Sequence, residues 1–328
     1  MGSIQSPYPP GIHVPCLTWF KPDSTQSIDW ELQEKHLEFL VRSGIHGIVI
    51  AGTNGEAATL TPAEKSKLVS LTRATAQKLD RPSLPITCGT FGGSTQAIIE
   101  DTKLAADAGA DYALVLVPSY FHFALDAVAI VGFFEEVASA SPIPVMIYNF
   151  PGVAAGLNVT SEMLETLGEH PNIVAVKLTC GTIASVARSV AKFGRAVDNP
   201  KFVALAGQSD WLVPCLSIGG AGSVTGLANL YPKVINNLKD PKACMEIFDL
   251  YNAGKTAEAE KLQIKLAVVE WGFGKGGING TKWVVAKYLG YPEESAWCRR
   301  PYPKFLDEEK RAWITKQVKG LEAVEKGL

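Results

Sequence analysis

The sequence has no long apolar run, no excess of charge of one sign and no paired cysteines. No apolar stretch approaches the about 20 residues needed to cross a bilayer, and the net charge is −2 over 328 residues. That balance gives no support for nucleic-acid binding. The six cysteines are scattered without a CxxC pair, as is typical of reduced thiols. We therefore expect a globular, cytoplasmic protein without a membrane or nucleic-acid partner.

Sequence motifs for metal, nucleotide and serine-nucleophile chemistry are also absent. The five histidines show neither HxH nor HExxH spacing, so no metal site is expected. No P-loop, no GxSxG elbow and no GxGxxG with an acidic partner occurs. The activity is therefore expected to need no cofactor.

The N-terminus is polar and proline-rich, and it lacks the apolar core of a signal peptide. We interpret residues 1–12 as a loose leader. Gly2 and Ser6 match the short myristoylation pattern, which also occurs often by chance, so the plain leader is the preferred interpretation.

Between residues 13 and 238, short β-branched runs alternate with amphipathic helical segments. Eight such units in about 230 residues match the length of a (β/α)8 barrel, with a doubly wound parallel sheet as the alternative. A barrel has no sheet edges, which explains why nearly every strand is a buried apolar run. The predicted strands are residues 13–20, 47–52, 85–91, 112–118, 144–151, 173–179, 201–207 and 222–228.

After residue 239 the strand pattern stops. The remaining chain, 239–328, contains segments with helical spacing and no proline- or glycine-rich linker before them. We expect a C-terminal helical extension packed on the barrel.

Lys177 lies inside the apolar run IVAVKLT, near the end of the sixth predicted strand. In a parallel barrel, functional groups lie at the carboxyl ends of the strands. Lysine is almost fully protonated in water at pH 7, but desolvation disfavours the charged ammonium form. The result would be a nucleophilic amine that condenses with a carbonyl. The alternative is a lysine that extends into solvent from a strand end.

Tyr148 ends the fifth predicted strand, at the level of Lys177. Its hydroxyl could transfer protons during imine formation and carbon–carbon cleavage. The alternative is a core aromatic residue with a satisfied hydroxyl.

The segment GTNGE, residues 52–56, follows the second predicted strand. Its glycines allow a tight turn that exposes Thr53, Asn54 and backbone N–H groups, which suit a carboxylate. A plain turn is the alternative. Glu56 is expected to bond the turn or cap a helix rather than act in chemistry.

Taken together, these motifs resemble the dihydrodipicolinate synthase and N-acetylneuraminate lyase superfamily of pyruvate-dependent class I aldolases. The similarity runs from about residue 11 to about residue 305. Its motifs are GTNGE at 52–56, YNFP at 148–151, VKLT at 176–179 and GGAGSVTGLAN at 219–229.

The resemblance implies a (β/α)8 barrel with a helical extension, assembled as a homotetramer of tight dimers. It implies that Lys177 forms the Schiff base and that Tyr148 transfers the proton. Thr53 and Asn54 match the positions that bind the pyruvyl carboxylate, and Thr53 also joins a proton relay with Tyr148. Tyr120, in VPSYF, matches a tyrosine that reaches the relay from the neighbouring subunit.

The resemblance further implies that Gly207 and Val224 line the pyruvyl pocket. Three positions depart from the usual pattern. Dihydrodipicolinate synthases carry an arginine for the second substrate's carboxylate where this chain has Val153, which disfavours that activity. Asn54 replaces a threonine, and Trp19 replaces a proline and is expected to reshape the mouth of the pocket.

These residues favour a lyase that reversibly cleaves a 4-hydroxy-2-oxo acid, or a 2-keto-3-deoxy sugar acid, into pyruvate and an aldehyde. The 4-hydroxy-2-oxoglutarate and 2-keto-3-deoxy-sugar-acid aldolases are the most similar branches. Two alternatives keep the same lysine: dihydrodipicolinate synthesis and dehydration of a keto-deoxy sugar acid. A third, of another class, is a non-catalytic barrel that senses a ligand.

Overall fold

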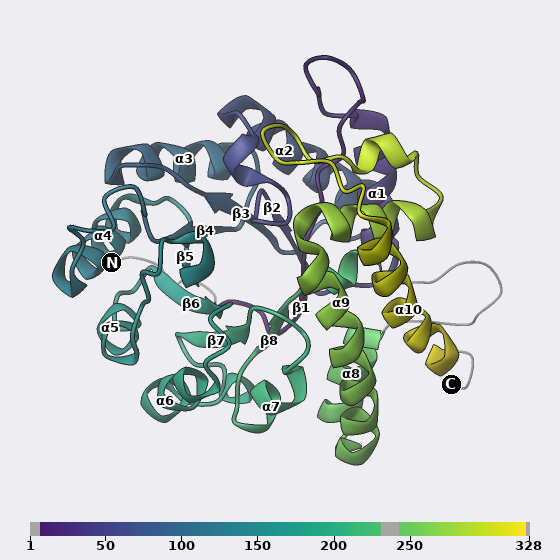
Figure 1. Ribbon diagram of the computed structural model, residues 1–328. Helices are drawn as coiled ribbons and strands as arrows, with labels where there is room; N and C mark the ends of the chain where they lie inside the picture. The colour runs from purple at the N-terminus through teal and green to yellow at the C-terminus, as the bar shows by residue number, and fades with distance from the viewer. Residues whose placement is uncertain (1–6, 231–242, 326–328) are drawn as a thin grey trace.

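A computed structural model describes residues 7–230 and 243–325. Eight parallel strands form a closed barrel in sequence order, and β8 pairs with β1 (Figure 1). The barrel predicted from the sequence is therefore confirmed. The strands are β1 (Gly11–Pro15), β2 (Gly47–Ile50), β3 (Ile86–Thr90), β4 (Tyr112–Leu116), β5 (Val145–Asn149), β6 (Ile173–Leu178), β7 (Val203–Ala206) and β8 (Gly222–Val224).

Helices alternate with the strands and surround the barrel (Figure 1). A capping box begins α2: the Thr61 side chain accepts from Glu64 N, and Glu64 accepts from Thr61 N. The helices of this layer are α1 (Trp30–Arg42), α2 (Pro62–Lys78), α3 (Thr95–Asp107), α4 (Ala127–Ala140), α5 (Ser161–Leu167), α6 (Ile183–Phe193) and α7 (Leu212–Ser217).

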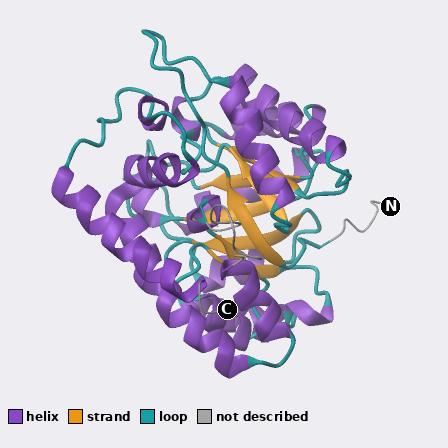
Figure 2. Ribbon diagram, turned by 90° about the vertical axis from the view of Figure 1, so that its right-hand side faces the viewer, coloured by secondary structure: helices purple, strands orange, loops and turns teal. Residues whose placement is uncertain are grey.

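Within the described part of the chain after β8, the α-helices are those expected of the C-terminal extension: α8 (Ala243–Asn252), α9 (Thr256–Leu289) and α10 (Glu308–Glu325). They lie together on one side of the barrel (Figures 1 and 2). Helix α9 breaks at Gly277, whose φ of 63° and ψ of −164° are not helical and favour glycine. The expected boundary at residues 238 and 239 lies outside the described residues.

The start of the chain differs from the expected loose leader. Tyr8 is 1% exposed and β1 begins at Gly11, so residues 7–12 belong to the barrel. The physical reason is that the Tyr8 ring is buried while its hydroxyl contacts His13 Nδ1 and Thr87 Oγ1, both at 3.0 Å. Gly2 and Ser6 lie outside the described residues.

Trp19 does not lie at the mouth of a pocket, contrary to expectation. It is fully buried and packs edge-on against His36 at 5.3 Å and against Tyr291 at 5.1 Å between ring centroids. It therefore joins α1 to the C-terminal extension. None of the helices within the described residues has the length and apolar character needed to cross a membrane.

Candidate active site

The carboxyl ends of β5 and β6 bring Tyr148 and Lys177 side by side. The two residues are direct partners in the strand register. Lys177 is 4% exposed, and its Nζ lies 4.3 Å from the centroid of the Tyr148 ring. The side chain therefore does not extend into bulk solvent, so the solvent-extended alternative is wrong.

Thr53, in the loop after β2, contacts the same tyrosine: its Oγ1 lies 3.0 Å from Tyr148 Oη. Glu56 anchors this loop. Its buried carboxylate accepts hydrogen bonds from Lys282 Nζ and Arg299 N, both at 2.7 Å. Glu56 adopts a left-handed conformation, with φ of 58°. It therefore holds the turn, as expected, and its backbone N–H donates to the Thr53 carbonyl at 3.0 Å.

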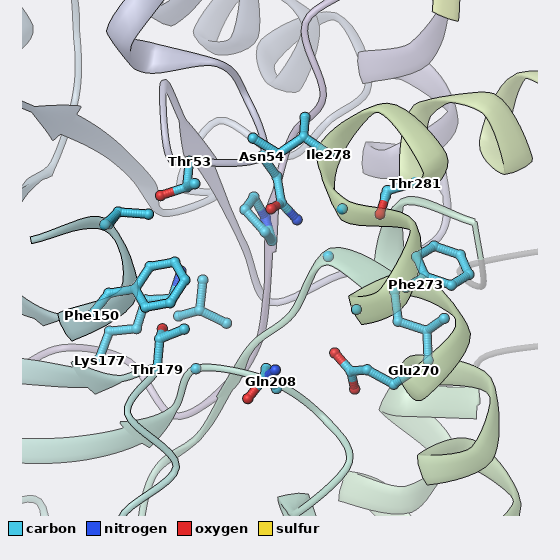
Figure 3. A pocket seen from close by; sticks show the side chains of 18 of the residues that line it. Thr53, Asn54, Phe150, Lys177, Thr179, Gln208, Glu270, Phe273, Ile278 and Thr281 are labelled. Atoms are coloured by element: carbon cyan, nitrogen blue, oxygen red, sulfur yellow. The ribbon is translucent and has the colours of Figure 1, made fainter. Parts of the chain in front are cut away.

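Lys177, Tyr148, Thr53, Asn54, Gly207 and Val224 all line one pocket of about 340 Å³ (Figure 3). A Cβ at Gly207 would lie 2.1 Å from Thr179 Oγ1, so only glycine fits where β6 and β7 end. Thr179 Oγ1 is buried and has no hydrogen-bond partner among the described residues. The Thr179 hydroxyl is therefore available for a hydrogen bond with a ligand in the pocket.

Tyr120 is the predicted site residue that lies outside this pocket. It is 79% exposed in the loop after β4, and its ring meets that of Phe121 edge-on at 5.0 Å. Phe123, in the same loop, is 78% exposed. Within one subunit, this loop does not contribute to the wall around Lys177.

A second cavity, of about 350 Å³, adjoins the first, and Thr53, Val153, Ile278 and Tyr302 line both. Most of its other lining side chains are apolar, including Phe91. Thr53 is therefore reachable from two sides.

The wall that α9 and the loop after it supply was not predicted from the sequence. Gln208 and Thr179 at the strand ends were also missed. The α9 side contributes Glu270, Phe273, Gly274, Gly277, Ile278 and Thr281, and Tyr302 follows (Figure 3). Glu270 could have been found, since it is a charged residue inside the apolar run LAVVEWGF at 266–273, just as Lys177 is in its strand.

Glu270 is buried against Ser209 and Thr225. Its Oε2 accepts from Ser209 N at 2.7 Å and from the Ser209 hydroxyl, and its Oε1 accepts from Thr225 Oγ1 at 3.0 Å. Burial, with the nearby Asp210 carboxyl, raises the pKa of Glu270 to about 7. The Ser209 and Thr225 hydroxyls also lie 3.0 Å apart. Above that pH Glu270 is a carboxylate that only accepts, and both hydroxyls donate to it.

The arrangement suits carbonyl chemistry by an amine. A buried lysine, a phenol against it and a hydroxyl on that phenol can form and break an imine. Across residues 7–230 and 243–325, no group of three or more histidine, cysteine, aspartate or glutamate side chains could hold a metal ion.

Comparison with known proteins agrees with this geometry. The dihydrodipicolinate synthetase family matches residues 9–320. The chain is 39% identical to the "Probable 4-hydroxy-2-oxoglutarate aldolase, mitochondrial" of Emericella nidulans, over 93% of each chain. It is 36% identical to the "L-threo-3-deoxy-hexylosonate aldolase" of Hypocrea jecorina, over 98% of each chain.

A solved structure shows the same fold over the whole chain. This is a protein from Coccidioides immitis, assigned to the dihydrodipicolinate synthase family, with a TM-score of 0.84, 35% identity and 99% of each chain covered. The resemblance stated from the motifs is therefore confirmed. The name of the Emericella nidulans protein places that protein in mitochondria, so the cytoplasmic location expected here stays a prediction.

Proposed function

The chain belongs to the dihydrodipicolinate synthetase family, and from this premise we propose that it is a class I aldolase acting through a Schiff base on Lys177. Its substrate is a 4-hydroxy-2-oxo acid or a 2-keto-3-deoxy sugar acid, which it cleaves reversibly into pyruvate and an aldehyde. No cofactor takes part in this scheme.

The reaction begins when the Lys177 amine adds to the C2 carbonyl. The carbonyl oxygen leaves as water, with one proton from the amine and one from the Tyr148 hydroxyl, and a protonated imine remains. This cation accepts the electron pair of the C3–C4 bond as that bond breaks, so an enamine forms. The C4 hydroxyl gives its proton to the Tyr148–Thr53 pair and becomes the aldehyde. The enamine takes a proton at C3, and water then hydrolyses the imine to release pyruvate.

One observation carries this proposal: the buried Lys177 amine lies 4.3 Å from the Tyr148 ring, and the Tyr148 hydroxyl lies 3.0 Å from Thr53. The substrate carboxylate would bind at Thr53 and Asn54, with Gly207 and Val224 packing against the pyruvyl group. These four residues line the same pocket.

The test is reductive trapping. The protein is incubated with pyruvate and borohydride, and the peptides are mapped by mass spectrometry. A reduced pyruvyl adduct is expected on Lys177 and not in the Lys177→Arg variant, whose guanidinium cannot form the imine. An unmodified Lys177 would reject the aldolase. Product analysis with keto-deoxy acids then separates cleavage, which releases pyruvate, from dehydration, which does not.

The assembly completes the proposal. We propose a homotetramer of two dimers in which Tyr120 of the partner subunit enters the second cavity and joins the Thr53–Tyr148 relay. Two features support this: the exposed aromatic loop at Tyr120, Phe121 and Phe123, and the largely apolar cavity beside Thr53. Burial of such an aromatic cluster would favour association.

This assembly is tested by light scattering together with kinetics. Tyr120→Phe should keep the oligomer and lower kcat. Tyr120→Asp should weaken the dimer and lower activity in proportion to the dimer lost. A fully active monomer would contradict the shared site.

A further inference from the structure

We propose that Glu270 selects the tail of the substrate: it accepts a hydrogen bond from a hydroxyl on the tail of a keto-deoxy sugar acid and disfavours a second carboxylate there. This inference rests on the proposed aldolase function, because it assigns the far part of a substrate whose C2 carbon is held at Lys177. Glu270 would favour a substrate with a neutral, hydroxylated tail over 4-hydroxy-2-oxoglutarate, whose tail is anionic.

The first argument is charge. Among the described residues that line the pocket, the charged side chains are Lys177 and Glu270. The imine on Lys177 would be offset by the pyruvyl carboxylate, so a second carboxylate would find no cation and would meet Glu270. Two like charges in a partly dry pocket repel each other strongly.

Two cations lie on neighbouring segments but are engaged elsewhere. Lys282 is fully buried and paired with Glu56 at 2.7 Å. Arg299 is paired with Glu64 at 2.7 Å. Neither lines the pocket, so no cation from the described part of the chain faces the tail region.

The second argument is hydrogen bonding. Ser209 and Thr225, both fully buried, hold the Glu270 carboxyl in place. A carboxyl group offers about four acceptor positions. Ser209 takes two of them and Thr225 takes one, so Oε1 retains an acceptor position for an incoming hydroxyl.

The third argument is the direction of the side chain. Glu270 extends from α9 with its carboxyl turned toward the side of the pocket where Gln208 lies, away from Thr53 and Asn54 (Figure 3). Gln208 adds a neutral polar group to this wall (Figure 3). A chain of hydroxyl groups suits such a wall better than a carboxylate does.

The two tails can be compared in the condensation direction. Cleavage between C3 and C4 splits a six-carbon keto-deoxy acid into pyruvate and glyceraldehyde, and 4-hydroxy-2-oxoglutarate into pyruvate and glyoxylate. The same carbon–carbon bond forms when pyruvate is supplied with either aldehyde. We expect the wild-type protein at pH 8 to show a kcat/KM at least about tenfold higher for one enantiomer of glyceraldehyde than for glyoxylate.

Glu270→Gln removes the charge and keeps the shape. Its kcat/KM for glyceraldehyde should fall about tenfold, as when a hydrogen bond loses a charged partner, while that for glyoxylate should stay the same or rise. Glu258→Gln is the matched control: it lies on the same helix, is exposed and should change neither value. Pyruvate trapping on Lys177 should remain at the wild-type level in both variants.

The outcomes separate the two proposals. If Lys177 is trapped by pyruvate but glyoxylate is used as well as glyceraldehyde or better, the role of Glu270 is overturned and the aldolase stands. The same holds if Glu270→Gln changes both aldehydes equally. If Lys177 is not trapped, the proposed function fails and this inference fails with it. The wild-type comparison needs no variant to fold.

Discussion

The two ends of the barrel bury polar side chains in opposite ways. At the amino end of the strands, the Tyr8 hydroxyl contacts His13 and Thr87, and His13 Nε2 contacts the Pro9 carbonyl at 2.9 Å. The Tyr112 hydroxyl donates to the Pro7 carbonyl at 3.3 Å. The side chains of Tyr8, His13, Thr87 and Tyr112 are thus paired within the protein.

At the carboxyl end, polar groups are left to face the pocket. Lys177 is buried, and no carboxylate among the described residues forms an ion pair with it. The Thr179 hydroxyl has no hydrogen-bond partner there either. Unpaired buried groups destabilise a fold, so this end gives up stability to keep groups available to a substrate. The amino end should govern stability, and the carboxyl end activity.

The largest effect should come from Lys177→Met, which replaces the amine with an apolar side chain of similar length. Activity should fall by at least about a thousandfold, because no other group can form the imine. The melting temperature should stay the same or rise, because the variant no longer buries an unpaired amine. Pyruvate release and thermal unfolding measure the two effects.

A Lys177→Met protein that melts well below the wild type would contradict the assignment of stability to the amino end of the barrel and activity to the carboxyl end. It would mean that this lysine also supports the fold. Lys201→Met is the control, since Lys201 is exposed and paired with Glu169 on the surface, so activity should not change.

Tyr148→Phe should have the next largest effect. The ring and its packing remain, but the hydroxyl that contacts Thr53 is lost, so kcat should fall about a hundred- to a thousandfold. Thr53→Val should have a smaller effect, because Tyr148 remains. Borohydride trapping by pyruvate should persist in both variants, since Lys177 is intact. Equal losses in trapping and in kcat would instead assign Tyr148 to imine formation alone.

Local patterns predicted the barrel and the lysine because both depend on short-range rules. Each strand is a β-branched run, and the residues at its carboxyl end meet in any parallel barrel. Lys177 and Tyr148 therefore met in register without any knowledge of the loops. The first strand was predicted at residues 13–20, but β1 is Gly11–Pro15. The segment CLTWF has the composition of a strand, although it lies in the loop after β1.

Packing between distant segments could not be predicted from the sequence. Nothing local shows that α9 passes beside the strand ends, so Glu270, Phe273 and Thr281 could not be placed in the pocket. Tyr8 was missed for the same reason, because its partners His13 and Thr87 come from two different strands. Trp19 follows a strand end in sequence yet packs against Tyr291, more than two hundred residues away.

The pH dependence of the unfolding free energy tests how the carboxyl end buries Glu270. Burial raises the pKa of Glu270 from an ordinary 4.5 to about 7. The folded protein therefore holds this proton while the unfolded chain has lost it, so stability should fall as the pH rises from about 5 to about 7. The loss would reach about 3 kcal/mol. Glu270→Gln should remove this loss.

The measurement is the difference in unfolding free energy between wild type and Glu270→Gln from pH 5 to pH 8. Burial lowers the pKa of His13 to about 3, which gives the opposite slope: stability falls as the pH drops below about 6.5. That contribution cancels in the difference. A difference that does not change with pH would contradict the raised pKa of Glu270.

The smallest effect, and the one that tests the amino end, is expected from Tyr8→Phe. The Pro9 carbonyl can only accept, so His13 Nε2 carries the proton and Nδ1 must accept from the Tyr8 hydroxyl. The variant leaves Nδ1 buried without this donor, and unfolding free energy should fall by about 1–3 kcal/mol. Tyr251→Phe, a half-buried tyrosine on α8, is the control. Because Tyr8 is remote from Lys177, kcat should not change; a loss of kcat with unchanged stability would reverse the roles assigned to the two ends.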